Sequence, residues 1–219
     1  MTNRPFTAIA AVAVFLAAGA YVVMSFTGLP PRVDSAIHKE IGRTLAQEAL
    51  ALRGPDGKLT VLVRDTAAFP QPAFDIARSA FDREIRRGGA TVAAVQLLQE
   101  DPLRPLQVPS GDFFELIRRS AVGDVIVSFM GPPLLTDEQR ANLTEIKPKI
   151  VAFCPGNMPE YINLRQLAQQ QLLHAGVLSR PLKPMAAGAP RAGPESFSEL
   201  YRRVDAKELA QLPEPGNRL

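Results

Sequence analysis

The chain has 219 residues and a mass of 23.7 kDa, enough for one domain with appendages but too short for two full-sized α/β lobes. Apolar residues make up 46% and charged residues 21%, which is a globular rather than a disordered composition. The single cysteine, Cys154, excludes an internal disulfide. With only two histidines beside it, the usual Cys/His zinc site is also excluded, so we expect no bound metal.

The net charge of +3 does not indicate a nucleic-acid-binding protein. Residues 32–179 carry 17 basic and 17 acidic side chains, and the excess of positive charge comes from residues 180–219 and from Arg4. The chain also has no tryptophan and only three tyrosines on which bases could stack. We therefore expect no nucleic-acid partner.

The first predicted element is a membrane-spanning helix within residues 1–31. The 27 residues 5–31 carry no charge, and the stretch Phe6–Phe26 is almost wholly apolar. As a helix, the 21 residues Phe6–Phe26 would extend roughly 32 Å, against about 30 Å for the hydrocarbon core of a bilayer. The pattern favours an uncleaved single-pass anchor that contacts the lipid bilayer, with the rest of the chain on the extracytoplasmic (periplasmic) side.

Two other interpretations of this segment remain open. Ala18-Gly19-Ala20 has the form of a signal-peptidase site, so the segment could be a secretory signal that is cleaved after Ala20. A buried helix of a soluble protein is the third interpretation. The first two interpretations both export the chain that follows.

An amphipathic helix is predicted within residues 32–57, because apolar residues recur at about every fourth position from Val33 to Leu52. Gly54-Pro55 then ends it. The apolar stripe either packs on the following domain or forms a stalk that docks on a partner membrane protein or on a second copy of this chain.

Residues 58–182 alternate between apolar runs and amphipathic periods, which is typical of an α/β domain. The helices between the runs include a period from Phe74 to Ile85 that ends at Gly88-Gly89, and a long helix that ends at Gly176. Capping boxes are expected at Asp112 with Glu115, Thr136 with Gln139, and Asn157 with Glu160. We predict a single flavodoxin-like or Rossmann-like parallel sheet of four or five strands with flanking helices. The expected strands are Leu59–Arg64, Ala90–Leu98, Val125–Phe129, Lys149–Cys154 and a short one at Val177–Leu178.

The remaining chain is predicted to be a linker followed by a short helix. Residues 183–195 are rich in proline, alanine and glycine and lack periodicity. Within residues 196–219, Ser196 and Glu199 form a capping box that opens a helix to about Leu212. Its apolar side must pack on this domain or on another chain.

The loops after the predicted strands carry few groups that could do chemistry. No glycine-rich phosphate loop and no G-x-S-x-G motif occurs, so we expect no cofactor. Asp65 is the one acid directly after the first strand. A single acid at a strand end is more often a helix or loop cap than a catalytic group. Cys154 precedes the helix cap Asn157, so it is either a thiolate activated by a helix amino terminus or a small buried apolar residue.

Residues 58–182 resemble the amino-terminal lobe of type I periplasmic solute-binding proteins. The resemblance rests on the order of elements, on Gly88-Gly89, on Gln99–Asp101 and on Ser128–Pro133. It implies that a small ligand contacts the loops after the strands, here Thr66, Phe69, Asp101 and Met130. The 37 residues after Leu182 cannot build the second lobe that closes over a ligand in that family.

The sequence thus predicts a membrane-anchored, extracytoplasmic binding or accessory domain that carries out no chemistry and associates with a protein partner or with its own copy. A receptor-like single lobe for a small solute is one alternative, and a cysteine-dependent or hydrolytic enzyme is the other. The candidate binding residues are Asp65, Thr66, Phe69, Asp101, Met130, Cys154 and Asn157.

Overall fold

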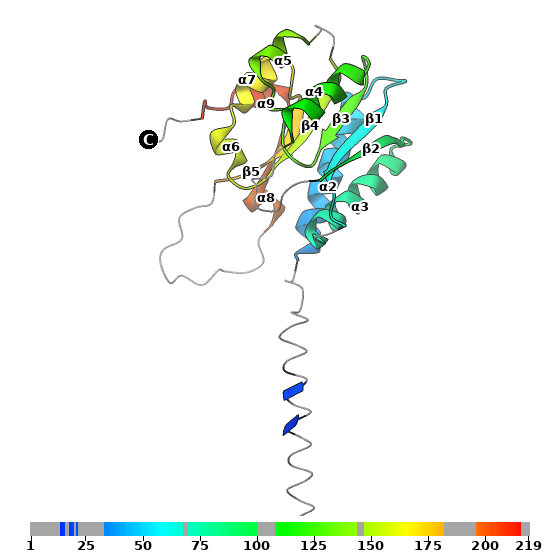
Figure 1. The fold of residues 1–219 in the computed structure, drawn as a ribbon, viewed down its shortest axis with the longest axis vertical. Coiled ribbons are helices and arrows are strands. Elements are labelled where there is room, and N and C mark those ends of the chain that lie inside the picture. Colours follow the sequence, from blue (N-terminus) through cyan, green and yellow to red (C-terminus); the bar gives the residue numbers. More distant parts are fainter. Residues whose placement is uncertain are drawn as a thin grey trace, which may run out of the picture. The chain divides into compact units, whose positions relative to one another are not determined.

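The computed structural model describes residues 14–15, 18–19, 21, 33–67, 70–99, 108–143, 147–181 and 196–215. The chain divides into two compact units, Met1–Asp34 and Ser35–Leu219. The second unit is an α/β domain (Figure 1). In chain order its elements are α2 (Ser35–Leu52), β1 (Leu59–Arg64), α3 (Pro72–Arg87), β2 (Val92–Leu98), α4 (Ser110–Arg119), β3 (Val125–Ser128), α5 (Asp137–Ala141), β4 (Lys149–Cys154), α6 (Met158–Tyr161), α7 (Leu164–Gln169), β5 (Ala175–Ser179), α8 (Phe197–Leu200), β6 (Tyr201–Val204) and α9 (Ala206–Ala210).

The described strands form one six-stranded sheet in the order β2-β1-β3-β4-β5-β6. Strands β1 to β5 are parallel, and β6 pairs antiparallel with β5. The predicted parallel α/β sheet is therefore confirmed, and β6 is an additional strand. Because β1 lies between β2 and β3, the strand order reverses there, as in flavodoxin-like folds.

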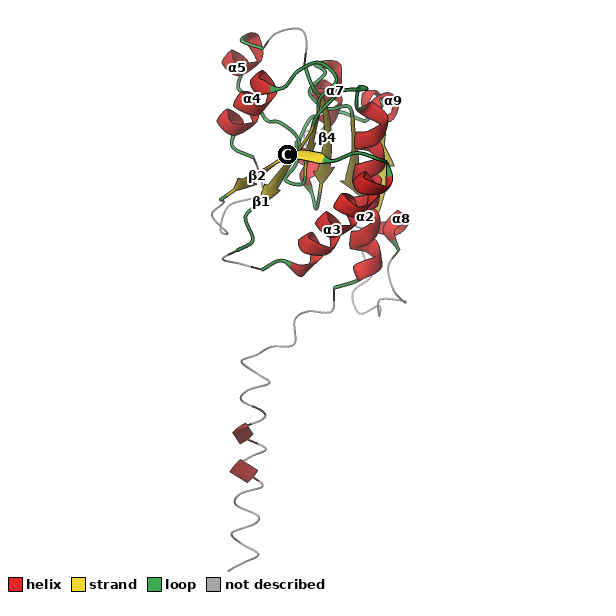
Figure 2. Ribbon diagram, turned by 90° about the vertical axis from the view of Figure 1, so that its right-hand side faces the viewer, coloured by secondary structure: helices red, strands yellow, loops and turns green. Residues whose placement is uncertain are grey.

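Two hydrophobic cores lie on the two faces of this sheet. On one face, α2 and α3 cover the side chains of Val61, Val127 and Val151. On the other face, α4, α6, α7 and α9 cover Leu62 and Ile126. Figure 2 shows α2 and α3 together in front of the sheet. Continuous apolar strands are needed because both faces are buried.

Helix α2 packs on the domain that follows it, which is one of the two interpretations of its apolar stripe. Ile41, Leu45 and Ala49 are fully buried against α3 and the sheet. A Cβ atom on Gly42 would collide with the carbonyl oxygen of Ala77, so α2 and α3 are in close backbone contact. The apolar stripe of α2 is thus buried within the domain and is not exposed as a docking surface.

The terminal segment differs from its prediction. The expected single helix from Ser196 to Leu212 is wrong, because Tyr201–Val204 forms β6 between the short helices α8 and α9. Strand β6 pairs with the backbone amide and carbonyl groups at the edge of β5, and Val204 lies opposite Gly176. The Asp205 carboxylate then accepts hydrogen bonds from the Lys207 and Glu208 amides, at 2.8 and 2.9 Å, and starts α9 as a cap.

The expected long helix after β4 is also divided. It consists of α6 and α7, because the Asn163 side chain accepts a hydrogen bond from the Gln166 amide at 2.9 Å and starts a new helix. Gly176 does not end a helix but lies within β5, where a Cβ would collide with the Ala152 carbonyl oxygen of β4.

Of the capping boxes expected between the strands, that of Thr136 with Gln139 is confirmed. The other two are wrong. Helix α4 begins at Ser110, before Asp112, and the Asn157 side chain makes no capping bond.

Several predictions fall outside the described residues. These are most of the Phe6–Phe26 anchor, the linker at residues 183–195, Phe69 and Asp101. Within the described part of the chain, no helix is both long and apolar enough to cross a membrane.

Candidate functional site

The carboxyl ends of β1 and β3 form the edge at which open parallel sheets bind ligands. Asp65 and Thr66 follow β1 directly and are partly exposed. The Asp65 carboxylate accepts a hydrogen bond from the Ala67 amide at 3.0 Å. Asp65 therefore stabilises the turn after β1, which is the loop-cap role expected for a lone acid at a strand end.

The end of β3 turns inward rather than toward solvent. The Ser128 hydroxyl accepts a hydrogen bond from the Met130 amide at 3.2 Å, and both residues are fully buried. Gly131 follows at a φ of 95°, a left-handed conformation that favours glycine. The Met130 side chain is consequently part of the core under α4 and α6 and is not exposed to a ligand in this structure.

Cys154, at the end of β4, is also fully buried, and burial raises the pKa of its thiol well above the usual range. His174 is near the other end of this strand, where its Nδ1 accepts a hydrogen bond from the Ile150 amide at 3.1 Å. Cys154 is four residue steps along the strand from Ile150, which corresponds to about 13 Å. The cysteine-dependent alternative thus lacks both an activated thiolate and a histidine base beside it.

A small cavity, here called the carboxyl-end cavity, lies beside the ends of β4 and β5. Its volume is about 320 Å³. Its walls combine a carboxylate, a guanidinium, an amide and an aromatic ring. They are formed by Gly156, Asn157, Glu160, Ser179, Arg180, Leu200 and Tyr201.

The positions of these groups are fixed by the junction between β5 and β6. The Arg180 amide donates to the Leu200 carbonyl oxygen at 2.7 Å, and Arg180 Nε donates to the Tyr201 carbonyl oxygen at 3.3 Å. The Tyr201 ring packs against those of Phe153 and Phe197, with centroid distances of 5.7 and 5.9 Å. The cavity therefore has one wall held by aromatic packing and one wall, at Asn157 and Glu160, that is exposed to solvent.

The sequence predicted only one residue of this cavity, Asn157. Glu160 was expected as a helix cap, and Arg180 and Tyr201 were not among the candidates. Tyr201 joins the cavity only because β6 pairs with β5, and no local sequence pattern marks that pairing.

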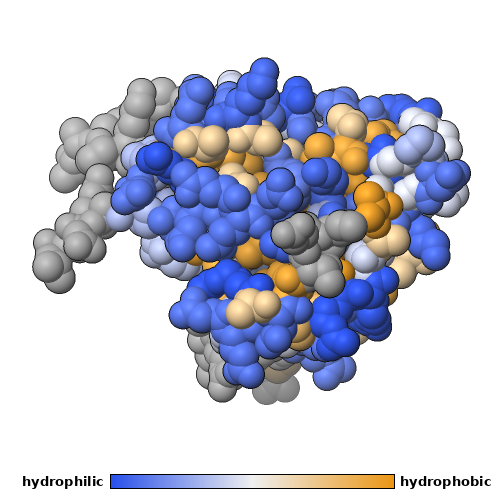
Figure 3. Space-filling view, turned by 90° about the horizontal axis from the view of Figure 1, so that it is seen from above, coloured by the Kyte–Doolittle hydropathy of each residue, from blue (hydrophilic) through white to orange (hydrophobic). Residues whose placement is uncertain are grey.

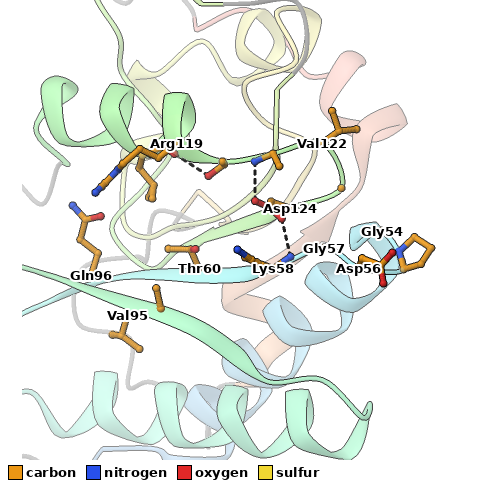
Figure 4. Close-up of a pocket in the computed structure, with 16 residues that line it drawn as sticks. Gly54, Asp56, Gly57, Lys58, Thr60, Val95, Gln96, Arg119, Val122 and Asp124 are labelled. Atoms are coloured by element: carbon orange, nitrogen blue, oxygen red, sulfur yellow. Dashed lines mark hydrogen bonds between the residues drawn. The ribbon is translucent and has the colours of Figure 1, made fainter.

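A larger cavity, here called the amino-end cavity, lies at the opposite end of the sheet and has a volume of about 1010 Å³ (Figure 4). Asp124 stiffens its wall by accepting hydrogen bonds from the Lys58 and Ala121 amides, each at 2.8 Å. Arg119 and Gln96 also border it. Seen from the top of Figure 1, the surface is largely hydrophilic with apolar patches between the polar residues (Figure 3).

Within the described residues, no three or more His, Cys, Asp or Glu side chains gather closely enough to hold a metal ion. The arrangement of polar groups at the carboxyl-end cavity suits reversible binding of a polar group, by hydrogen bonding and by contact with an aromatic ring.

No family model and no curated protein matches the sequence. Among solved structures, a sugar-binding protein of a sugar ABC transporter from Bacillus halodurans is 10% identical, with a TM-score of 0.50 over 80% of this chain and 64% of that one. A periplasmic ribose ABC transporter protein from Conexibacter woesei is 11% identical, with a TM-score of 0.43 over 64% of this chain and 45% of that one. A putative LacI transcriptional regulator from Bacteroides fragilis is 11% identical, with a TM-score of 0.46 over 67% and 47%.

The similarity to the Bacillus halodurans protein shows that the chain has the α/β fold of type I periplasmic binding proteins, which confirms the predicted resemblance. The chain spans between 45% and 64% of the length of these three solved structures. At 10–11% identity, the similarity concerns the fold alone.

Proposed function

We propose that this chain is a membrane-anchored binding domain on the extracytoplasmic side, which recognises a protein partner through the carboxyl end of its sheet and carries out no chemistry. The observation that supports this most directly is the carboxyl-end cavity, with Asn157, Glu160 and Arg180 around one open wall. The α/β domain supplies one side of a binding cleft. The partner supplies the other side.

The anchor is supported by the uncharged stretch of residues 5–31. It is tested by amino-terminal sequencing of protein extracted from membranes with detergent. A mature chain that begins at Met1 or Thr2 supports the anchor, whereas a chain that begins at Tyr21 shows a cleaved signal and refutes it. Protease treatment of intact spheroplasts should digest the domain if it is extracytoplasmic.

The partner is tested by gentle detergent extraction followed by identification of proteins that co-purify. Asn157→Arg places a bulky cation at an exposed position of the carboxyl-end cavity and should abolish specific co-purification. The matched control is Arg119→Glu, which changes charge at the opposite end of the sheet and should retain the partner. Retention of the partner by Asn157→Arg would show that this cavity is not the recognition site.

A second candidate function is a receptor-like lobe for a small polar solute. It is favoured by the size of the carboxyl-end cavity, about 320 Å³, and by the Tyr201 ring next to hydrogen-bonding groups. The Bacillus halodurans protein of the same fold is described as sugar-binding. Isothermal titration with a panel of pentoses and hexoses tests it. Saturable binding that Asn157→Ala weakens at least tenfold supports the receptor, and no heat with any sugar removes it from consideration.

A further inference from the structure

The two edges of the sheet differ in how they are protected. Edge strand β6 is four residues long and carries two exposed arginines, Arg202 and Arg203. Short length and charged side chains are the usual means by which proteins prevent edge strands from pairing with other chains. Edge strand β2 has neither protection, because its seven residues, Val-Ala-Ala-Val-Gln-Leu-Leu, include no charge and no proline.

The backbone of β2 is open along this edge. The Leu98 carbonyl oxygen accepts a hydrogen bond from the Asp65 amide at 2.8 Å, so Leu98 directs its main-chain groups toward β1. Main-chain direction alternates along a strand, so Val95 and Leu97 direct their amide and carbonyl groups away from β1. Within the described residues, β2 pairs with no strand other than β1.

The side chains at this edge are apolar and exposed. In the sheet register, Val95 lies beside Val61 and Leu97 lies beside Val63. Val61 and Val63 are buried, with exposed fractions of 0% and 4%, whereas Val95 and Leu97 are 47% and 61% exposed. The apolar face that α3 covers therefore continues uncovered to the edge of the sheet, next to open backbone groups.

A second copy of this chain is the occupant that fits the charges. Two β2 strands placed antiparallel bring no like charges together, because neither has any. Helix α3 runs along β2 on one face (Figures 1 and 4). It has Asp75 in its first turn and Arg86 and Arg87 in its last turn, all of them exposed. A two-fold axis reverses α3, so the acidic end of one helix would lie toward the basic end of the other.

We propose that β2 is the interface through which two copies of this chain associate, edge to edge and antiparallel, so that their two sheets become one continuous sheet. The contact is isologous, the commonest form of association in homodimers. It needs no other protein, and it rests on the folded unit alone rather than on the proposed binding function.

The test uses short bis-maleimide cross-linking of the full-length chain in mild detergent. Single variants Val95→Cys and Leu97→Cys lie on the open edge, and at least one of them should yield a cross-linked dimer in high yield. Native Cys154 is fully buried and does not compete. Val122→Cys is the control, because Val122 is 70% exposed but lies in the turn before β3.

Specificity is tested with charges. Leu97→Lys adds a lysine at an exposed position and should lower the cross-linking yield of Val95→Cys at least tenfold, whereas the matched control Val122→Lys should leave it unchanged. Asp75→Arg should weaken the cross-link, and Asp75→Arg combined with Arg86→Asp and Arg87→Asp should restore it. Circular dichroism checks that each variant is folded.

Three results would overturn the proposal. One is the absence of cross-linked dimer for both edge cysteines, Val95→Cys and Leu97→Cys. Another is a cross-link at Val95→Cys that Leu97→Lys does not reduce. The third is capture of a different protein at Val95→Cys in place of a second copy, because the edge would then serve a heterologous partner.

Discussion

Removing residues 196–219 should unfold the domain, although the sequence presents this segment as an appendage behind a linker. Its side chains contribute to the core opposite α2 and α3. Val204, Leu209 and Leu212 are 1%, 0% and 9% exposed and pack with residues of β5 and α7. Removing the segment would also expose the edge of β5, where four residue pairs join β5 to β6.

The magnitude follows from these three side chains. Each contributes about 1.5–3 kcal/mol by burial, which gives about 5–9 kcal/mol in total. A domain of this size has a free energy of unfolding of about 5–15 kcal/mol. The truncated chain is therefore expected to be unfolded or nearly so at 25 °C. Leu209→Ala isolates one contribution and should lower the free energy of unfolding by about 2–5 kcal/mol.

The assay is urea unfolding of the full-length chain in mild detergent, followed by far-UV circular dichroism. Lys207→Ala, an exposed position on the same helix, is the matched control and should change the free energy of unfolding by less than about 0.5 kcal/mol. A truncated protein with the urea midpoint of the intact chain would refute the placement of α9 in the core. A Leu209→Ala midpoint equal to that of Lys207→Ala would do the same.

Three further predictions concern Cys154, His174 and Gly57. Cys154→Ala should leave partner binding unchanged, and iodoacetamide should label the native thiol only after unfolding, so rapid labelling at pH 6 would contradict its burial. Burial and the nearby cations Lys149 and Lys147 lower the pKa of His174 to about 4 from 6.5, so the folded state favours neutral imidazole. The contribution of His174 to the free energy of unfolding should accordingly be fully present above pH 6.5, and the free energy of unfolding should fall by about 2–3 kcal/mol as the pH drops to about 4. In urea titrations, His174→Gln should remove this loss. Gly57→Ala should destabilise the domain by about 1–3 kcal/mol, because its Cβ would collide with the Gly123 carbonyl oxygen, and an unchanged thermal midpoint would show that the loop yields freely.

The parallel part of the fold could be predicted because its strands are local apolar runs between helical periods. Lys149–Cys154 was predicted with the same bounds that the structure shows. Strand β6 could not be predicted in this way, because Arg202 and Arg203 interrupt any apolar pattern within four residues. Its conformation depends on the open edge of β5, a partner more than twenty residues away in the chain.

The candidate site was predictable only in its general location. The rule that ligands bind at the carboxyl ends of strands points to the edge where the carboxyl-end cavity lies, and it selects Asn157, which lines that cavity. The same rule also selects Met130 and Cys154, which are both fully buried in the core. Strand ends define an edge, but the turns that follow them decide which side chains face solvent.

The connection from β5 to α8 has a consequence for how this architecture could grow. Its two ends are adjacent, since the Arg180 amide donates to the Leu200 carbonyl oxygen at 2.7 Å. A chain that leaves and re-enters a fold at neighbouring points can accept a whole inserted domain without altering the pairing of any strand. A domain inserted between Pro181 and Ser196 would emerge beside the carboxyl-end cavity and could cover its solvent-exposed wall at Asn157 and Glu160. One insertion at this single point would therefore turn a one-sided surface into an enclosed cleft.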